Sequence, residues 1–376
     1  MSTSRNRTIP VVIAVLVLVS ALALLAACGS DQAVRGNSPL AVPEDLECIP
    51  EDDISGAGSS AQENAMQVWM AGYMTVCSDT QVFYDVIGSG GGRSKFLDGA
   101  VEFAGSDAPL EGTEQQWAQE RCNGAPAIHL PSYVVPIAVI FRLRGVDSVN
   151  LSPHTLAHVF AGEISHWDDP AITADNPDLD LPHQRITPVN RSDESGTTEN
   201  FTTYLSQAAG QAWPHEPSGQ WPVQPVEAAQ GNSGIAEAVE GGEGTIGYVE
   251  ASHVGELSTA RIGVGETFVE VSAESAAKIL NSSPEREGGS EYDHAVNVDY
   301  RTDDPDIYPI VLISYEIACL SYEKPVDARG VKAFLSYILS AEGQQAAAEE
   351  AGSAPLSAEI LAKLAPAVRA IDSNGE

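Results

Sequence analysis

Short apolar runs with strand composition alternate with segments of helical spacing along this chain, and this alternation constrains the fold more than any other feature. The strand-like runs are residues 81–87, 101–104, 130–141 and 307–319. The helical segments are residues 61–73, one starting near residue 93, 201–205, 331–339 and 341–350. Strands that alternate with helices predict an α/β fold with mainly parallel strand pairing.

Length and charge narrow the class further. A chain of 376 residues exceeds one small core and predicts two domains once a leader is removed. The formal net charge is −34, and no basic stripe runs along the sequence. Nucleic acid is therefore excluded as an expected partner. Screening limits the reach of the acidic surface to about 8 Å at physiological salt, so an anionic ligand in a closed site stays compatible with it.

The N-terminus has the pattern of an export signal. Arg5 and Arg7 precede an apolar run over residues 9–27, which ends in Leu-Ala-Ala before Cys28. The run also has the length of a retained membrane anchor, but small residues at its end favour cleavage. Leu-Ala-Ala-Cys resembles a bacterial lipobox, which implies that residues 1–27 are removed and Cys28 carries acyl chains such as palmitate. Residues 28–47 then form a tether on the outer face of the cell membrane.

Four cysteines remain in the mature chain: Cys48, Cys77, Cys122 and Cys319. An even count in an exported protein indicates two disulfides, and the sequence allows three pairings. We favour Cys48–Cys77 with Cys122–Cys319. Zinc is the alternative, but no two of these cysteines have C-x-x-C spacing.

Three segments join glycine to small hydroxyl residues next to predicted helices: residues 56–61 (GAGSSA), 88–92 (GSGGG) and 190–198 (NRSDESGTT). Helix N-termini carry unpaired N–H groups and partial positive charge, so three that converge would cradle an oxyanion. Each segment alone also fits a simple helix cap. The first matches G-x-G-x-x-A, but no clear strand precedes it, and no Gly-Lys-Ser/Thr phosphate loop occurs.

Two charged residues suggest which oxyanion is bound. Arg191 opens the third segment and can bind an oxyanion through two N–H groups. Asp107 follows a short predicted strand and can accept a hydrogen bond from a phosphate O–H. Sulfate has no proton to offer, and its bare oxygen against the carboxylate would cost at least about 1–3 kcal/mol. Asp107 also fits a surface turn before Pro109.

Seven motifs resemble those of the phosphate-binding protein of the bacterial high-affinity phosphate ABC transporter, and they occur in the same order. That protein is a PstS-type lipoprotein, and the resemblance is to its actinobacterial form. The motifs are residues 56–60, 87–92, 105–110, 167–172, 191–197, 231–236 and 244–249, and the likeness spans about residues 54–345. The resemblance implies a type II periplasmic-binding fold: two α/β lobes with a ligand cleft between them. It assigns residues 48–136 and 309–370 to lobe I and residues 137–308 to lobe II. Crossing strands near residues 136–141 and 308–314 would form the hinge.

Carried over by position, the resemblance implies a set of phosphate ligands without cofactor or metal. Asp107 is the acceptor, and Asp193 orients Arg191. The donors are Ser60, Ala61 through its N–H, Ser89, Arg191, Ser195, Gly196 and Thr197. The sequence departs from the family at Ala61, often aromatic, at Gly90, often Ser, and at Glu194, often Gly. We expect Glu194 to point to solvent.

The predicted function is capture of inorganic phosphate outside the cytoplasmic membrane, under phosphate starvation, by a monomer that is not an enzyme. The resemblance implies delivery to the membrane permease and ATPase subunits of an ABC importer. An exported phosphatase-like hydrolase and a phosphate-binding surface antigen are the alternatives. The sequence lacks a G-x-S-x-G elbow. His154 and His158 have a metal-like spacing of four, but no third ligand is evident.

Overall fold

The structure is a computed structural model that describes residues 46–49, 53–279 and 283–373, all within one compact unit. The predicted leader, Cys28 and most of the predicted tether lie outside these residues. In the described part of the chain, no helix combines the length and the apolar character needed to cross a membrane.

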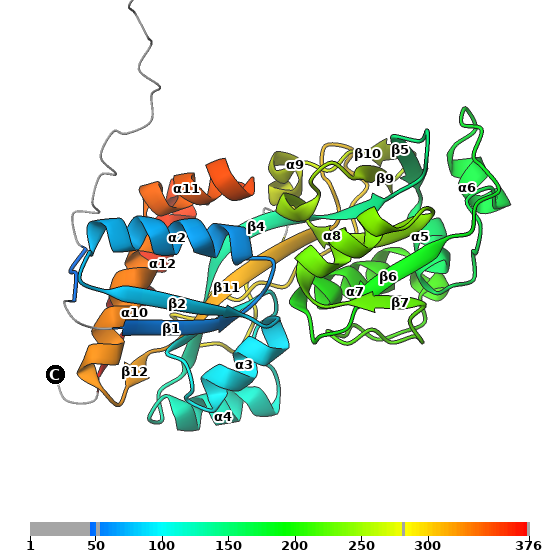
Figure 1. Ribbon diagram of the computed structural model, residues 1–376. Coiled ribbons are helices and arrows are strands. Elements are labelled where there is room, and N and C mark those ends of the chain that lie inside the picture. The colour runs from blue at the N-terminus through cyan, green and yellow to red at the C-terminus, as the bar shows by residue number, and fades with distance from the viewer. Residues whose placement is uncertain (1–45, 50–52, 280–282, 374–376) are drawn as a thin grey trace, which may run out of the picture. The chain divides into compact units, whose positions relative to one another are not determined.

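Lobe I is the part built on β1 (Asp53–Gly58), β2 (Gln81–Val86), β3 (Phe103–Ser106) and β11 (Val311–Cys319), in the order β2-β1-β3-β11. The crossovers through α2 (Glu63–Val76) and α3 (Ser89–Leu97) run in opposite directions along the sheet. Right-handed connections therefore place these helices on opposite faces, as Figure 1 shows. The other helices of lobe I are α4 (Thr113–Arg121), α10 (Pro325–Ile338), α11 (Ala341–Ala351) and α12 (Ala358–Arg369). A short pair, β12 (Ser321–Tyr322) with β13 (Asp372–Ser373), joins the end of α12 to the end of β11.

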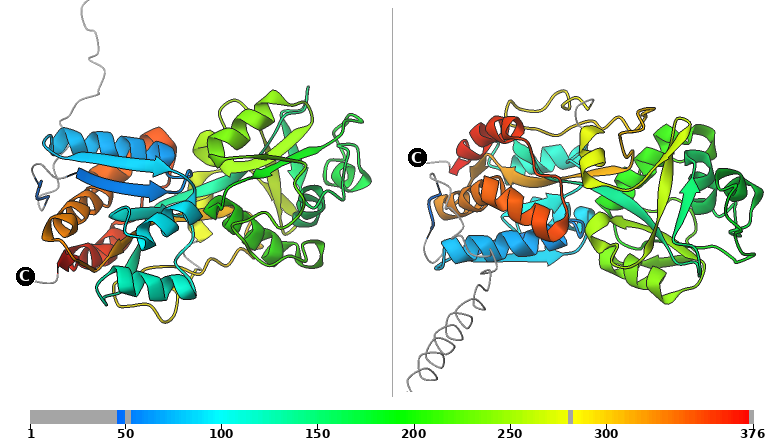
Figure 2. Two further views of the ribbon diagram at one scale, coloured as in Figure 1. Left: turned by 60° about the horizontal axis from the view of Figure 1, so that its bottom comes forward. Right: turned by 90° about the horizontal axis from the view of Figure 1, so that it is seen from above.

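Lobe II continues the same sheet in the order β4-β8-β6-β7, which puts β8 (Thr245–Glu250) and β6 (Thr187–Arg191) in its centre. Figure 2 shows the lobe from two further sides. Its other strands are β5 (Ser148–Leu151), β7 (Glu227–Ala229), β9 (Ser258–Val264) and β10 (Thr267–Val269). Its helices are α5 (Pro153–Phe160), α6 (Pro170–Asp175), α7 (Gly196–Ala208), α8 (Gly231–Gly241) and α9 (Ala273–Ala277), with short turns η1 (Gly210–Ala212) and η2 (Ala251–His253).

One long strand, β4 (Ala127–Phe141), belongs to both lobes. Its residues 127–136 pair with β11, and its residues 137–141 pair with β8. Where the partner changes, the Ile137 N–H donates to the Ile310 carbonyl over 2.8 Å and the Tyr308 hydroxyl donates to the Ile137 carbonyl over 2.8 Å. The chain thus enters lobe II along β4 and returns along β11.

The expectation of mainly parallel pairing is wrong for the centre of the sheet. β11 pairs antiparallel with both β3 and β4, and β4 pairs antiparallel with β8. The reason is the return path, because a strand that leads the chain back between the lobes runs against the strand that led it out. Parallel pairing persists in β2-β1-β3 and in β8-β6-β7, where helices connect the strands.

The disulfides are Cys48–Cys77 and Cys122–Cys319, which confirms the pairing that we favoured and makes the zinc alternative wrong. The first ties the segment before β1 to the end of α2. The second ties the end of α4 to the end of β11, across 197 residues of sequence. Both crosslinks lie in lobe I, so lobe II folds without one among the described residues.

Two glycine-rich segments differ from their predicted structure. Residues 56–58 are the end of strand β1, which the sequence did not reveal, and α3 begins at Ser89 rather than near residue 93. Glycine normally disfavours a helix. Here a Cβ at Gly92 would lie 2.4 Å from the Cα of Gly58, so the close approach of α3 to β1 requires glycine and overrides that preference.

Candidate functional site

The predicted site residues come together from both lobes. In lobe I, Ser60 Oγ accepts hydrogen bonds from the Asn232 backbone N–H over 3.2 Å and from Asn232 Nδ2 over 3.0 Å, and Asn232 lies in the first turn of α8 in lobe II. A Cβ at Gly196 in lobe II would lie 2.5 Å from both Ser89 Oγ and Asp107 Cβ. The start of α7 therefore lies directly against the Ser89–Asp107 pair.

The first lobe I segment turns sharply at the end of β1. Gly58 has φ of 147°, and a Cβ there would lie 1.9 Å from the Gly105 carbonyl oxygen, so only glycine fits. The Ser59 N–H donates to that same carbonyl over 2.8 Å, and the Ala61 N–H donates to Ser59 Oγ over 2.9 Å. The turn is thus fixed by its own hydrogen bonds, one of which occupies the Ala61 N–H that we expected to donate to phosphate. Ser60 is the residue that faces lobe II.

Asp107 is buried rather than placed in a surface turn, with only 4% of its surface exposed. Ser314 Oγ donates to Oδ1 over 2.5 Å, and Ser89 Oγ lies 3.2 Å from Oδ2. Burial raises the pKa of Asp107, while the Ser314 hydroxyl and the nearby Arg191 charge oppose that rise. A carboxylate oxygen has two lone pairs, so one hydrogen bond to each oxygen leaves capacity for a ligand O–H.

Arg191, the last residue of β6, brings a buried positive charge, with 1% of its side chain exposed. Its Nε donates to Asp193 Oδ1 over 2.8 Å and its Nη2 to Asp193 Oδ2 over 2.5 Å. Burial alone would raise the pKa of Asp193, but the hydrogen bonds and charge of Arg191 hold it below its usual value. Arg191 Nη1 is buried and has no hydrogen-bond partner among the described residues.

Helix α7 starts beside this guanidinium. Ser195 is its N-cap, and Ser195 Oγ accepts from the Thr198 N–H over 3.1 Å. Gly196 and Thr197 follow, both buried, and helix geometry leaves their N–H groups without an intrahelical acceptor. The unpaired Nη1 of Arg191 and these two N–H groups form a donor set that suits a small oxyanion.

Three contributors were missed by sequence reasoning. Asn232 lies inside a motif that we noted but without an assigned role. Ser314 reaches Asp107 from 207 residues away, and nothing local in a buried strand indicates such a contact. Arg93 of α3 has 8% of its side chain exposed and reaches Glu194 across the lobes.

Glu194 is exposed, as expected, but its carboxylate also contacts the other lobe. Glu194 Oε1 lies 3.3 Å from Arg93 Nη2, and the Glu194 carbonyl accepts from the Gly90 N–H over 3.2 Å. The side chain stays 47% exposed, so it lies at the edge of the cluster. Its partner was not apparent because Arg93 comes from the other lobe.

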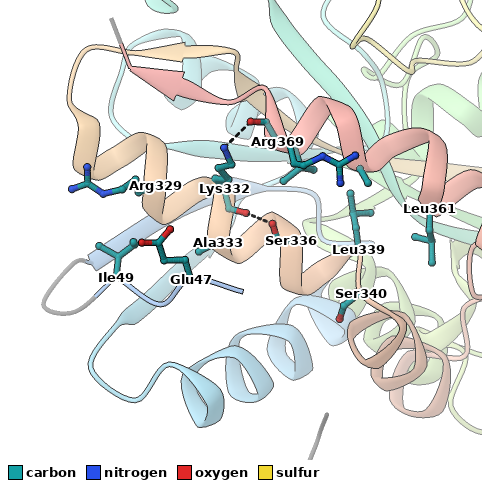
Figure 3. A pocket seen from close by; sticks show the side chains of 12 residues that line it. Glu47, Ile49, Arg329, Lys332, Ala333, Ser336, Leu339, Ser340, Leu361 and Arg369 are labelled. Atoms are coloured by element: carbon teal, nitrogen blue, oxygen red, sulfur yellow. Dashed lines mark hydrogen bonds between the residues drawn. The ribbon is translucent and has the colours of Figure 1, made fainter. Parts of the chain in front are cut away.

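Two surface hollows differ in how they relate to this donor set. One of about 360 Å³ adjoins Asp107 and is lined also by Glu199, Arg286 and Tyr300. Another of about 260 Å³ lies between α10 and α12, where Lys332 donates to the Arg369 carbonyl, as Figure 3 shows. It contains none of the predicted ligands. Within the described ranges, no group of three or more His, Cys, Asp or Glu side chains has a metal-binding arrangement.

Comparison with known proteins gives one consistent result. Residues 31–342 match the family described as the PBP superfamily domain. The chain is 36% identical over 364 residues to phosphate-binding protein PstS 3 of Mycobacterium tuberculosis, covering 95% of this chain and 98% of that protein. It is 34% identical over 257 residues to phosphate-binding protein PstS of Xylella fastidiosa, covering 66% of this chain and 67% of that protein.

Solved structures share the fold. A high-affinity periplasmic phosphate-binding protein, PfluDING, superposes with a TM-score of 0.69 at 23% identity, covering 83% of this chain and 92% of that one. A putative phosphate ABC transporter substrate-binding protein from Clostridium perfringens, with bound phosphate, gives a TM-score of 0.55 at 21% identity and covers 79% and 97% of the two chains.

Proposed function

The chain belongs to the PstS-type phosphate-binding proteins of the PBP superfamily, and from that membership we propose that its interlobe cluster binds inorganic phosphate for an ABC-type phosphate importer. The observation that carries the proposal is Arg191 Nη1, a buried cationic donor without a partner among the described residues. A buried donor left unpaired costs about 1–3 kcal/mol, and more when it is charged, so the site is complete only with an acceptor in it.

Phosphate fits the donors and the acceptor at once. Its oxygens accept from Arg191 Nη1 and from the N–H groups of Gly196 and Thr197, while Ser60 and Ser195 supply hydroxyls around them. Ser89 joins these donors by turning its O–H from Asp107 Oδ2 to the anion. One proton lies between the anion and Asp107, whose carboxylate accepts the phosphate O–H. Closing the two lobes removes the anion from water, which strengthens each of these contacts.

The division of the chain follows from the same proposal. Residues 48–136 and 309–370 form lobe I and residues 137–308 form lobe II, so that the ligand lies where both lobes contribute. Support comes from β4, whose partner changes from β11 to β8 between Pro136 and Ile137. The hinge then consists of two adjacent strands, which allows a rigid-body opening.

Cellular placement extends the proposal beyond the described residues. Cys28 carries acyl chains and holds the monomeric protein on the outer face of the membrane, where it meets the permease and ATPase subunits of the importer. The Leu-Ala-Ala-Cys sequence supports this placement. Labelling with radioactive palmitate tests it: the native chain takes up label and a Cys28→Ala variant does not.

Calorimetric titration of the purified protein with phosphate and with sulfate tests the function itself. We expect saturable binding of phosphate and a selectivity for phosphate of at least about tenfold, because sulfate lacks the proton that Asp107 requires. Comparable affinity for both anions, or no binding of either, contradicts the proposal. A parallel assay with a chromogenic phosphate ester separates binding from hydrolysis, and steady release of the chromophore would favour the hydrolase alternative.

A further inference from the structure

Glu194 stands in sequence between Asp193 and Ser195 of the lobe II cluster, yet its side chain contacts lobe I. Its Oε1 lies 3.3 Å from Nη2 of Arg93, a residue of α3. The Arg93 guanidinium makes two further hydrogen bonds within lobe I. Arg93 Nε donates to Glu114 Oε1 over 3.1 Å, and Arg93 Nη1 donates to Ser106 Oγ over 3.3 Å. The guanidinium is therefore fixed in lobe I and presents one edge to lobe II.

The absence of a side chain at Gly90 makes this contact possible. A Cβ at Gly90 would lie 2.4 Å from Glu194 Cδ, 2.5 Å from Cγ and 2.7 Å from Cβ, all closer than real Cβ contacts. The Gly90 N–H also donates to the Glu194 carbonyl over 3.2 Å. Gly90 and Glu194 are thus sterically coupled across the lobes, and any side chain at residue 90 conflicts with the carboxylate arm.

Several carboxylates surround Arg93, and their repulsion explains what the contact with Glu194 could do. Glu111 and Glu114 of lobe I approach Glu194 and Glu199 of lobe II. Burial raises the pKa of Glu199 to about 7, the Arg93 charge opposes the rise, and the three other carboxylates reinforce it. Like charges on both lobes resist closure, and two cations offset them: Arg93, which pairs with Glu114 and Glu194, and Arg286, which pairs with Glu111 over 2.6 Å.

We propose that Arg93, Gly90 and Glu194 form an interlobe latch, a set of positioning residues that holds the lobes closed and slows release of the bound anion without touching it. The latch rests on the proposed phosphate function for its physiological use, but its geometry involves protein groups alone. Because Glu194 is half exposed, its ion pair with Arg93 should weaken with added salt.

A double-mutant cycle tests the latch through the rate of phosphate release, measured by chasing bound radioactive phosphate. Glu194→Gly removes the arm, and we expect release about threefold faster, as for a partly exposed ion pair. Gly90→Ser keeps the arm but places a Cβ against it, and we expect a larger acceleration. In the double variant the added Cβ meets no arm, so the effect of Gly90→Ser should largely disappear.

Equal effects of Gly90→Ser with and without the Glu194 side chain would overturn the latch, since the coupling is its defining property. Glu237→Gln is the matched control, because it removes an exposed carboxylate of lobe II from α8, and its release rate should equal that of the native protein. Circular dichroism identifies a variant that fails to fold, and the cycle then uses Gly90→Ala in its place.

A measurement without ligand separates this inference from the proposed function. Small-angle scattering of the phosphate-free protein should give a larger radius of gyration for Glu194→Gly than for Glu237→Gln, because the open form gains population. If the native protein binds phosphate and the cycle is additive, the latch alone fails. If the native protein does not bind phosphate but Glu194→Gly still opens it, the function fails and the latch stands.

Discussion

The two lobes bring different chemistry to the shared site. Lobe I contributes hydroxyl groups and the carboxylate of Asp107, whose oxygens already accept from Ser314 and Ser89. Lobe II contributes the start of helix α7 and a guanidinium whose buried Nη1 has no hydrogen-bond partner among the described residues. Under the proposed function, attraction for an anion therefore comes from lobe II, and recognition of its proton comes from lobe I. Neither lobe alone supplies both, so binding and closure are linked.

Removing the cation from lobe II should have the largest effect. Arg191→Ala deletes the buried Nη1 donor and leaves the Asp193 carboxylate without its cationic partner, and loss of one member of a buried charge pair costs about 2–5 kcal/mol. We expect phosphate affinity to fall about 100-fold or more in a calorimetric titration. Arg301→Ala is the control, because Arg301 is 70% exposed and pairs with Asp299 at the surface. Native phosphate affinity in Arg191→Ala would contradict the inference that Arg191 supplies the attraction for the anion.

Changing the carboxylate in lobe I should affect selectivity more than attraction. Asp107→Asn keeps the size but lets an amide N–H face the ligand, which suits a bare sulfate oxygen better than a phosphate O–H. We expect the ratio of phosphate to sulfate affinity to fall about tenfold or more, from the cost of an unmet buried acceptor. Asp79→Asn, an exposed change, should leave the ratio unaltered. An unchanged ratio in Asp107→Asn would remove Asp107 from recognition.

The parts of the site differ in how far the sequence predicted them. The glycine and hydroxyl segments and Arg191 were identified locally, because helix starts and short motifs carry their signal within a few residues. Strand β1 was missed because its Gly56-Ala57-Gly58 end lacks the β-branched residues that mark strands. Ser314, Asn232 and the Arg93–Glu194 pair depend on tertiary approach between distant segments. The spacing of residues along the sequence does not predict such contacts.

A second buried carboxyl, that of Glu316 on β11 of lobe I, should make the stability of the protein depend on pH. Burial raises the pKa of Glu316 to about 8, and the hydrogen bond from Ser132 opposes the rise. Glu316 Oε2 and Gln62 Oε1 both lack hydrogen-bond partners among the described residues. A protonated Glu316 has an O–H to donate, which suits two acceptors that are otherwise unpaired.

The sign of the pH effect follows from linkage. With a folded pKa of about 8 and an ordinary value of 4.5, the folded protein holds a proton that the unfolded chain has lost. The stability from this proton is present below about pH 4.5 and is lost as pH rises through about 8. Urea unfolding should show the native protein losing about 2 kcal/mol relative to Glu316→Gln between pH 6 and pH 8. Parallel pH profiles for the two proteins would contradict a protonated Glu316.

The smallest effect should appear in the pH dependence of sulfate binding. This measurement reports on the proton of Asp107 in lobe I, because sulfate carries none. Burial raises the pKa of Asp107 above its ordinary value of 3.8, so acidification protonates this carboxyl earlier than an exposed aspartate. A protonated Asp107 donates to a sulfate oxygen, and sulfate itself does not titrate in this range. We expect sulfate affinity to rise about threefold as pH is lowered from 7 to 5, in calorimetric titrations at constant ionic strength. The same series in Asp107→Asn should be flat, because its amide does not titrate. A rise that persists in that variant would assign the proton to another group and leave lobe I without its role in recognition.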